Sequence, residues 1–178
     1  MKDITILENF INDEELEEAR QFIGEESINI NGKIYHENDP AINRQWFFVI
    51  TDNAYKKILI DLRPQRDWPY DMENVIPSAK KFILKIKNRI DKCTNTNFKL
   101  ERVYLNRQVR GQDVTLHTDD QKPNVYTLLI YIGDITPENY NKAGGDLELK
   151  TKEITRIEPF TKRAVLFKGI YHIRLMHH

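Results

Sequence analysis

The chain has 178 residues, enough for one domain with a substantial core, and its 27 basic and 27 acidic residues give a formal net charge of zero. This balance excludes a global electrostatic attraction to nucleic acid or to anionic membranes. The single cysteine, Cys93, excludes an internal disulfide, and no run approaches the roughly 20 apolar residues of a membrane span. We therefore predict a soluble, cytoplasmic protein that forms one domain over residues 1–178.

The N-terminal part of the chain, residues 1–98, is predicted to be helical with short strands. Residues 3–11 are typical of a strand that runs into a turn. Asn12, with Glu15 three positions later, then indicates a capping box at a helix N-terminus. Gly24 is the predicted end of this helix. Its buried face is indicated by apolar residues at helical spacing, namely Leu16, Ala19, Phe22 and Ile23.

Three further elements are expected before residue 98. Residues 25–50 are punctuated by Gly, Pro, Asn and Asp, and we predict two weak strands there. Residues 55–62 carry apolar positions along one face of a second helix. Residues 75–90 keep a period of about 3.6 residues and predict a third helix, with Pro77 tolerated only in its first turn.

The pattern changes at residue 99, and short strand-like runs continue toward the end of the chain. Turn-forming residues separate runs that are rich in β-branched and aromatic side chains. These runs cover residues 99–108, 113–118, 125–132, 145–150, 154–158 and 162–168. We predict an α+β domain in which the N-terminal helices buttress a β sandwich or jelly roll.

One histidine–acid pair lies within the β-rich part. Side chains two apart on a strand point to the same face, so His117 and Asp119 can converge on one point. His172 follows the strand at residues 162–168 and supplies a second imidazole. Two histidines and one carboxylate that leave coordination positions open are typical of non-haem Fe(II) oxygenases. The competing interpretation of a His-x-Asp pair alone is a turn or a hydrogen-bonded surface pair.

The order of the surrounding segments resembles the Fe(II)/2-oxoglutarate-dependent dioxygenases, and within them the prolyl-4-hydroxylase-like branch. The residues that carry the resemblance are "HTD" at 117–119, the strand "TLLIYIGD" after it, the turn "GGDLELK" and "KRAVLF" before His172. The resemblance implies a double-stranded β-helix over residues 99–178, with the iron between its two sheets. It also implies His117, Asp119 and His172 as metal ligands and catalytic residues.

The same resemblance implies the cofactors and the cosubstrate site. Fe(II), 2-oxoglutarate and O2 would be used, with ascorbate as an accessory reductant, to hydroxylate a C–H bond while 2-oxoglutarate becomes succinate and CO2. Tyr131, Tyr104 and Asn106 would line the cosubstrate cavity. For Tyr131, a core aromatic with its hydroxyl at the rim is an equally good interpretation. The expected substrate is a peptidyl proline or a similar residue, in a peptide or a small molecule.

The sequence departs from the family pattern at its end. The family carries an Arg or Lys on the strand after the distal histidine, where it pairs with the far carboxylate of 2-oxoglutarate. Here the sequence stops at His178, so we expect that last strand to be missing. Arg174 is too near His172 to replace this cation, and Lys162 and Arg163 are expected to face solvent.

Two other functions remain open. An AlkB-type nucleic-acid dealkylating oxygenase would use the same metal chemistry, and Arg102, Arg107 and Arg110 give a local basic patch before the motif. A solvated strand face is the simpler interpretation of these charges. The third candidate is a jelly-roll binding module without catalytic activity, which the missing cationic strand favours.

Overall fold

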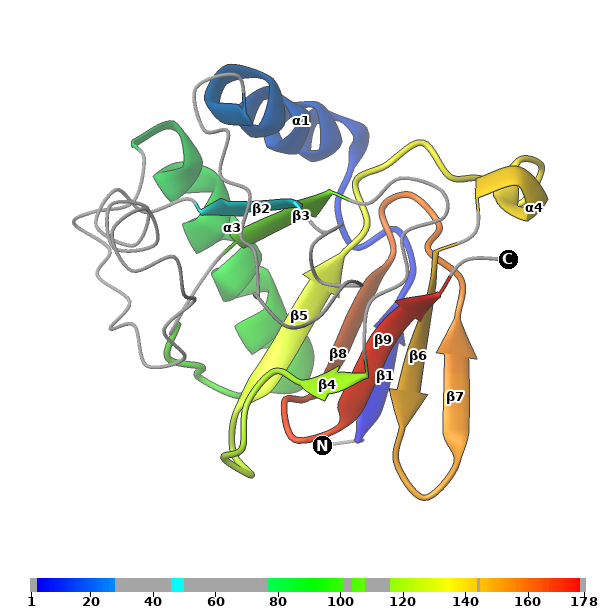
Figure 1. Cartoon of the computed structure of the whole chain (residues 1–178). Helices are drawn as coiled ribbons and strands as arrows, with labels where there is room; N and C mark the ends of the chain where they lie inside the picture. Colours follow the sequence, from blue (N-terminus) through cyan, green and yellow to red (C-terminus); the bar gives the residue numbers. More distant parts are fainter. Residues whose placement is uncertain are drawn as a thin grey trace, which may run out of the picture.

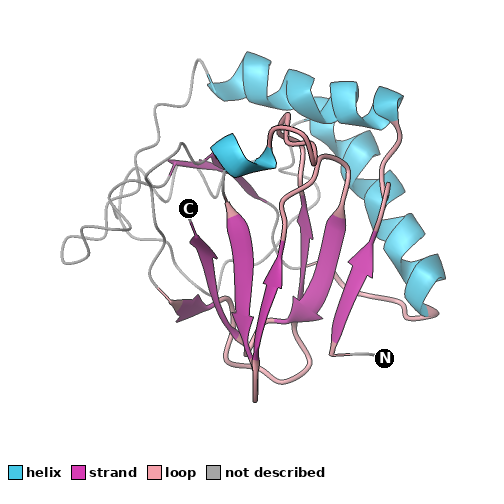
Figure 2. Cartoon of the chain, turned by 90° about the vertical axis from the view of Figure 1, so that its right-hand side faces the viewer, coloured by secondary structure: helices cyan, strands magenta, loops and turns pink. Residues whose placement is uncertain are grey.

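The structure is a computed structural model that describes residues 3–27, 46–49, 77–100, 104–107, 116–143 and 145–176. Two long helices lie on one side of a set of antiparallel strands (Figures 1 and 2). The helices are α1 (Asp13–Ser27) and α3 (Pro77–Thr94), and a short helix, α4 (Tyr140–Ala143), follows later. No helix in these ranges is both long and apolar enough to cross a membrane.

Within the described ranges, the strands form two larger antiparallel sheets and one two-stranded sheet. The first sheet has the order β1–β8–β5, the second has the order β4–β9–β6–β7, and β2 pairs with β3. Their bounds are β1 (Ile4–Leu7), β2 (Trp46–Val49), β3 (Tyr104–Arg107), β4 (His117–Thr118), β5 (Tyr126–Ile130), β6 (Asp146–Lys150), β7 (Ile154–Ile157), β8 (Ala164–Lys168) and β9 (His172–Met176). The predicted α+β class with antiparallel strands is therefore confirmed.

Strand β8 joins two hydrophobic cores because its side chains alternate between the faces of the first sheet. Ala164 and Leu166 pack on the helical side, with residues of α1 and α3. Val165 and Phe167 pack on the other side, against the second sheet. The second core comprises Leu147, Leu149, Ile157, Val165, Phe167 and Ile173. The helices thus buttress the first sheet, as predicted, and the two sheets face each other across apolar side chains.

The start of α1 follows the predicted capping box. The Asn12 side chain accepts a hydrogen bond from the Glu15 amide at 2.9 Å, and the Glu15 carboxylate accepts one from the Asn12 amide at 3.0 Å. Glu15 is also buried and binds Arg89 of α3 through both carboxylate oxygens, at 2.7 Å and 2.5 Å. This carboxylate therefore fixes the helix start and joins the two helices.

Acid should weaken this link between the helices. The hydrogen bonds from Arg89 hold the pKa of Glu15 below its ordinary value of 4.5. A lowered folded-state pKa contributes stability that is present above the unfolded-state value and is lost as the pH falls through the folded-state value. We expect Glu15→Gln to lower the free energy of unfolding by about 1–3 kcal/mol at pH 7, because hydrogen bonds to a charged group are lost.

The measurement is urea unfolding of the wild type and of Glu15→Gln between pH 7 and pH 3. The stability difference between the two proteins should shrink as the pH falls from 4.5 through the lower pKa of folded Glu15, because the carboxylate is protonated first in the unfolded and then in the folded wild type. Other carboxylates titrate in both proteins, so the difference isolates Glu15. A difference that stays constant down to pH 3 would show that the ion pair contributes nothing.

The helices α3 and α1 differ in how well the sequence-based predictions of their ends agree with the structure. Pro77 is the first described residue of helix α3, and proline is tolerated in the first turn of a helix because the amides there are unpaired. Helix α1 runs past Gly24 to Ser27, so the predicted end at Gly24 is wrong. A glycine inside a helix costs only about 1 kcal/mol relative to alanine, and the following Glu25 and Glu26 are good helix formers.

Several predicted elements have only partial counterparts among the described residues. Strand β2 falls within one predicted extended region, residues 25–50. The predicted helix at residues 55–62 lies outside the described residues. Helix α4 and strand β9 were not predicted as elements. The boundary at residue 98 between a helical part and a β part stays a prediction.

Candidate metal centre

His117 and Asp119 lie together at the end of strand β4. The distance from His117 Nε2 to Asp119 Oδ1 is 3.7 Å, and the Asp119 side chain is only 6% exposed, against 39% for His117. Two donors that each bind one ion at about 2.0–2.2 Å, at right angles, lie about 3 Å apart. A small side-chain rotation would therefore let both atoms bind the same ion. These two residues fit the expected metal site.

Strand β5 holds the Asp119 carboxylate from the neighbouring sheet. Thr127 Oγ1 donates a hydrogen bond to Asp119 Oδ2 at 2.6 Å, which leaves Oδ1 turned toward His117. The sequence did not single out Thr127. The signal was present, because Thr127, Leu129 and Tyr131 are two apart along one strand face, and Tyr131 was already a candidate. Such outer partners orient the groups that bind a metal.

The turn before strand β9 packs closely against the residue after Asp119. The Asp120 amide donates to the Gly169 carbonyl at 3.0 Å, and the Gly169 amide donates to the Val125 carbonyl at 2.9 Å. A Cβ atom at Gly169 would lie 3.1 Å from the Asp120 Cβ, so a side chain there would force a shift. The backbone therefore brings the start of β9 next to the motif, and glycine permits the approach.

His172 does not join the other two residues in this structure. In the β4–β9 ladder, His117 lies opposite Ile173, and Thr118 lies opposite His172. Directly opposite residues share a face, so His172 lies on the other face from His117. Exposure agrees, since His172 is exposed and Ile173 is buried. Among the described residues, no three His, Cys, Asp or Glu side chains group closely enough to hold a metal ion.

Tyr131 carries a buried hydroxyl beside the core between the two sheets. Its ring packs against the cluster that contains Phe167, and its hydroxyl has no hydrogen-bond partner within the described residues. Burial raises the pKa of Tyr131, and the negative charge of Asp146 raises it further. The hydroxyl therefore stays protonated and can donate a hydrogen bond to an acceptor that enters this space.

Two other predicted cosubstrate residues, Tyr104 and Asn106, lie on strand β3, opposite Val49 and Phe47 of β2. The structure describes only the backbone of β3, so their roles stay predictions. Of the arginines in the alternative basic patch, Arg107 is also on β3, while Arg102 and Arg110 lie outside the described residues.

The candidate cations near the end of the chain are engaged elsewhere. Arg174 binds the buried carboxylate of Glu148 at 2.9 Å. The prediction that Arg163 faces solvent is wrong, because its side chain is buried and pairs with Glu8 at 2.8 Å and Glu158 at 3.0 Å. Two carboxylates satisfy the guanidinium and make its burial tolerable. Lys162 is likewise half-buried and pairs with Asp13 at 2.9 Å.

Removing the outer hydrogen bond to Asp119 should weaken metal binding. Thr127→Val keeps the side-chain shape but removes the hydrogen bond that orients Asp119 Oδ2, so we expect the Mn(II) dissociation constant to rise at least tenfold, within the roughly 10–100-fold typical of outer-shell partners. The measurement is calorimetric titration of the metal-free protein with Mn(II). Thr155→Val makes the same exchange on β7, at the opposite edge of the β4 sheet, and should change affinity less than about twofold. Equal affinities for both variants would rule out a role for Thr127.

Comparison with known proteins supports the fold and leaves the chemistry open. No protein-family model and no curated protein matches the sequence. A prolyl hydroxylase from Trichoplax adhaerens, solved with a peptide fragment of the hypoxia inducible factor oxygen degradation domain, matches with a TM-score of 0.64 and 16% identity over 98% of this chain and 77% of that chain. A prolyl-4-hydroxylase from Pseudomonas putida matches with a TM-score of 0.59 and 10% identity over 98% and 85%. The chain thus has a prolyl-4-hydroxylase-like fold.

Proposed function

We propose that this protein is an Fe(II)- and 2-oxoglutarate-dependent dioxygenase that hydroxylates a C–H bond. The observation that carries the proposal is the His117–Asp119 pair, fixed by Thr127, between the sheets of a prolyl-4-hydroxylase-like fold. In this proposal the two facing sheets are the two halves of a double-stranded β-helix. The site lies where strands of both sheets contribute polar side chains to an otherwise apolar space.

The proposed metal ligands are His117, Asp119 and His172. The first two need only a small side-chain rotation to bind one ion, whereas His172 requires a change of the backbone. His172 is the first residue of β9 and pairs with Thr118 of β4 and Lys150 of β6. In this proposal a backbone rotation at residues 171–172 breaks these two pairings and turns the imidazole toward His117, while the later residues of the strand keep their places. The buried side chain of Ile173 and the Arg174–Glu148 bond would keep the strand in place. A shift of the whole strand is excluded, because it would expose Ile173.

The proposed cosubstrate site includes the Tyr131 hydroxyl. A 2-oxoglutarate carboxylate is a strong acceptor, and a buried, protonated tyrosine without a partner in the described part of the chain is a suitable donor. Tyr104 and Asn106 would contribute from β3. Bound Fe(II), 2-oxoglutarate and O2 supply the oxidation, while the protein orients these groups and excludes water.

The proposed substrate is a peptide that contains proline. The Trichoplax neighbour, which was solved with a peptide bound, supports a peptide. The test is succinate release by the Fe(II)-loaded protein with proline-containing peptides and, separately, with alkylated single-stranded DNA. Stimulation by peptides is the expected result, and stimulation by the DNA alone would favour the nucleic-acid dealkylating alternative.

The binding-module alternative makes a different prediction in the same assay. A protein that binds metal and 2-oxoglutarate without catalysis would give saturable binding of both but no succinate above the level of a metal-free control. Succinate release without added substrate, at a slow rate that depends on Fe(II), would already exclude that alternative. No binding of 2-oxoglutarate to the metal-loaded protein would overturn the proposed function.

A further inference from the structure

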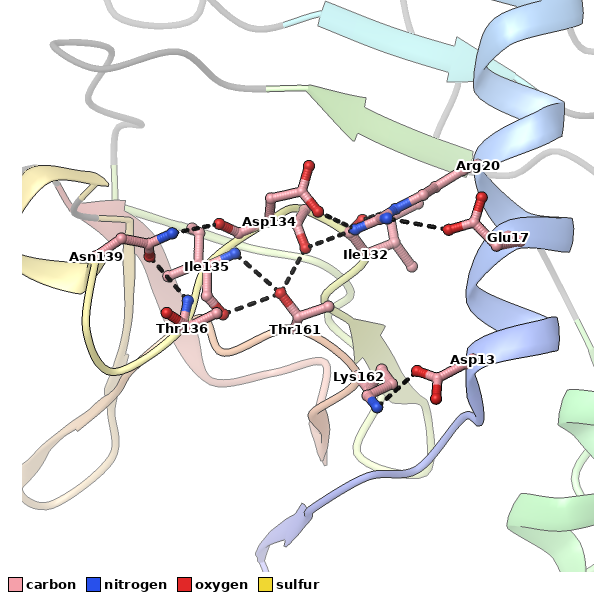
Figure 3. Close-up of polar contacts among 11 residues, drawn as sticks. Asp13, Glu17, Arg20, Ile132, Asp134, Ile135, Thr136, Asn139, Thr161 and Lys162 are labelled. Carbon is pink, nitrogen blue, oxygen red and sulfur yellow. Dashed lines mark hydrogen bonds and ion pairs between the residues drawn. The ribbon is translucent and has the colours of Figure 1, made fainter.

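The segment that follows Tyr131 is anchored to helix α1 by one arginine (Figure 3). Arg20 Nε donates to the Ile132 carbonyl at 3.1 Å, and Nη2 donates to the Gly133 carbonyl at 3.2 Å. Nη2 also pairs with the Asp134 carboxylate. One guanidinium thus binds three successive residues, and its rigid planar fork of five donors suits this arrangement better than the compact ammonium of a lysine.

A second anchor holds the same segment from the turn before β8. Thr161 Oγ1 lies 2.5 Å from the Gly133 carbonyl oxygen and accepts a hydrogen bond from the Ile135 amide at 2.9 Å. Asn139 closes the following turn, accepting from the Thr136 amide at 2.8 Å. The carbonyl of Gly133 therefore binds both Arg20 of α1 and Thr161 of the turn before β8.

The contacts of Arg20 begin at Ile132, one residue after Tyr131, whose buried hydroxyl belongs to the proposed cosubstrate site. The Tyr131 amide donates to the Arg163 carbonyl at 2.9 Å, and its carbonyl accepts from the Lys162 amide at 2.8 Å. Strand β5 ends at Ile130, so Tyr131 lies where the regular ladder stops and strands commonly fray. The bonds from Arg20 to the next two carbonyls oppose that fraying.

We propose that Arg20 is a positioning residue for Tyr131: through the carbonyls of Ile132 and Gly133 it fixes the depth of the tyrosine hydroxyl between the sheets. The expected effect of Arg20 on cosubstrate affinity rests on the proposed function. The structural part of the inference, that Arg20 holds Tyr131 in place, does not. The hydrogen bonds of the Arg20 guanidinium go to Glu17, Ile132, Gly133 and Asp134, so its effect on Tyr131 passes through the backbone.

The structural content is tested without any ligand, by hydrogen exchange of the Tyr131 and Ile135 amides. Arg20→Met keeps an aliphatic stem and removes every donor, so exchange at both amides should accelerate about tenfold or more. Lys162→Met is the matched control, because it removes the other cation that ties α1 to this region, the pair with Asp13, and leaves the Arg20 contacts. Equal acceleration in the two variants, or none in Arg20→Met, would overturn the proposal.

The functional consequence is tested by a double-mutant cycle on 2-oxoglutarate affinity in the Mn(II)-loaded protein. Arg20→Met should raise the dissociation constant about tenfold, as expected for a misplaced donor, with Arg20→Lys intermediate and Lys162→Met unchanged. In a Tyr131→Phe background, Arg20→Met should have no further effect, because the hydroxyl that it positions is gone. Additive losses would overturn a role through Tyr131. If the wild type binds no 2-oxoglutarate, the proposed function fails, and the exchange experiment still decides whether Arg20 holds Tyr131.

Discussion

His117→Ala should abolish metal binding while leaving the protein folded. The imidazole is one of the two proposed ligands that lie together in the described part of the chain, 3.7 Å from Asp119 Oδ1. Losing an outer-shell partner costs about 10–100-fold in metal affinity, so losing a ligand should cost more than about 100-fold. Because the His117 side chain is 39% exposed, its removal forfeits little packing, and the thermal midpoint should change by no more than a few degrees.

The measurement is metal content after dialysis against Fe(II) or Mn(II), with circular dichroism as the check on folding. Asp119→Ala should give the same loss of metal. Asp120→Ala is the matched control, because this neighbouring carboxylate caps the Lys122 amide at 2.8 Å and has no place in the proposed ligand set. Full metal occupancy in both His117→Ala and Asp119→Ala would contradict the site.

Phe167→Ala should destabilise the protein more than the loss of the His117 imidazole or of the Glu15 charge. The Phe167 side chain is 1% exposed and lies in the core between the two sheets. Replacing a buried phenylalanine by alanine typically costs about 3–5 kcal/mol, from lost burial and from the cavity that remains. A loss of this size is a large part of the roughly 5–15 kcal/mol by which a domain is stable.

Urea unfolding measures this loss directly. Ile154→Ala is the comparison, because Ile154 is 56% exposed on β7 and its truncation should change the free energy of unfolding by less than about 0.5 kcal/mol. Similar small losses for both variants would mean that the sheets do not pack on Phe167 as described.

Sequence patterns predicted the elements that are determined by residues close to one another in the chain. These elements are the capping box of Asn12 and Glu15, helix α3 and the strands β5 to β8, which follow from spacing and residue type within a few positions. The predicted end of α1 at Gly24 is wrong for a local reason, because the helix tolerates one glycine, whereas the wrong prediction for Arg163 concerns a residue whose burial depends on a distant partner. Arg163 is buried because Glu8 and Glu158 come to it, and Glu8 is 155 positions away in the chain.

In the candidate site, too, one part follows from neighbouring residues and the rest depends on residues far apart in the chain. The pairing of His117 with Asp119 follows from their two-residue spacing, whereas the position of His172 depends on the register between β4 and β9. Register is a tertiary property, and a change of one residue moves a side chain to the other face. The contributions of Thr127, Gly169 and Arg20 likewise depend on contacts between separate segments, which no local pattern specifies.

The central claim is that His117, Asp119 and His172 bind one metal ion. A crystal structure of the Mn(II)- and 2-oxoglutarate-loaded protein, with the metal located by anomalous scattering, tests it most directly. The claim predicts one ion at about 2.0–2.3 Å from an imidazole nitrogen of each histidine and from an Asp119 oxygen, with His172 turned inward relative to the present structure. An ion held without His172, or no ion beside His117 and Asp119, would contradict it.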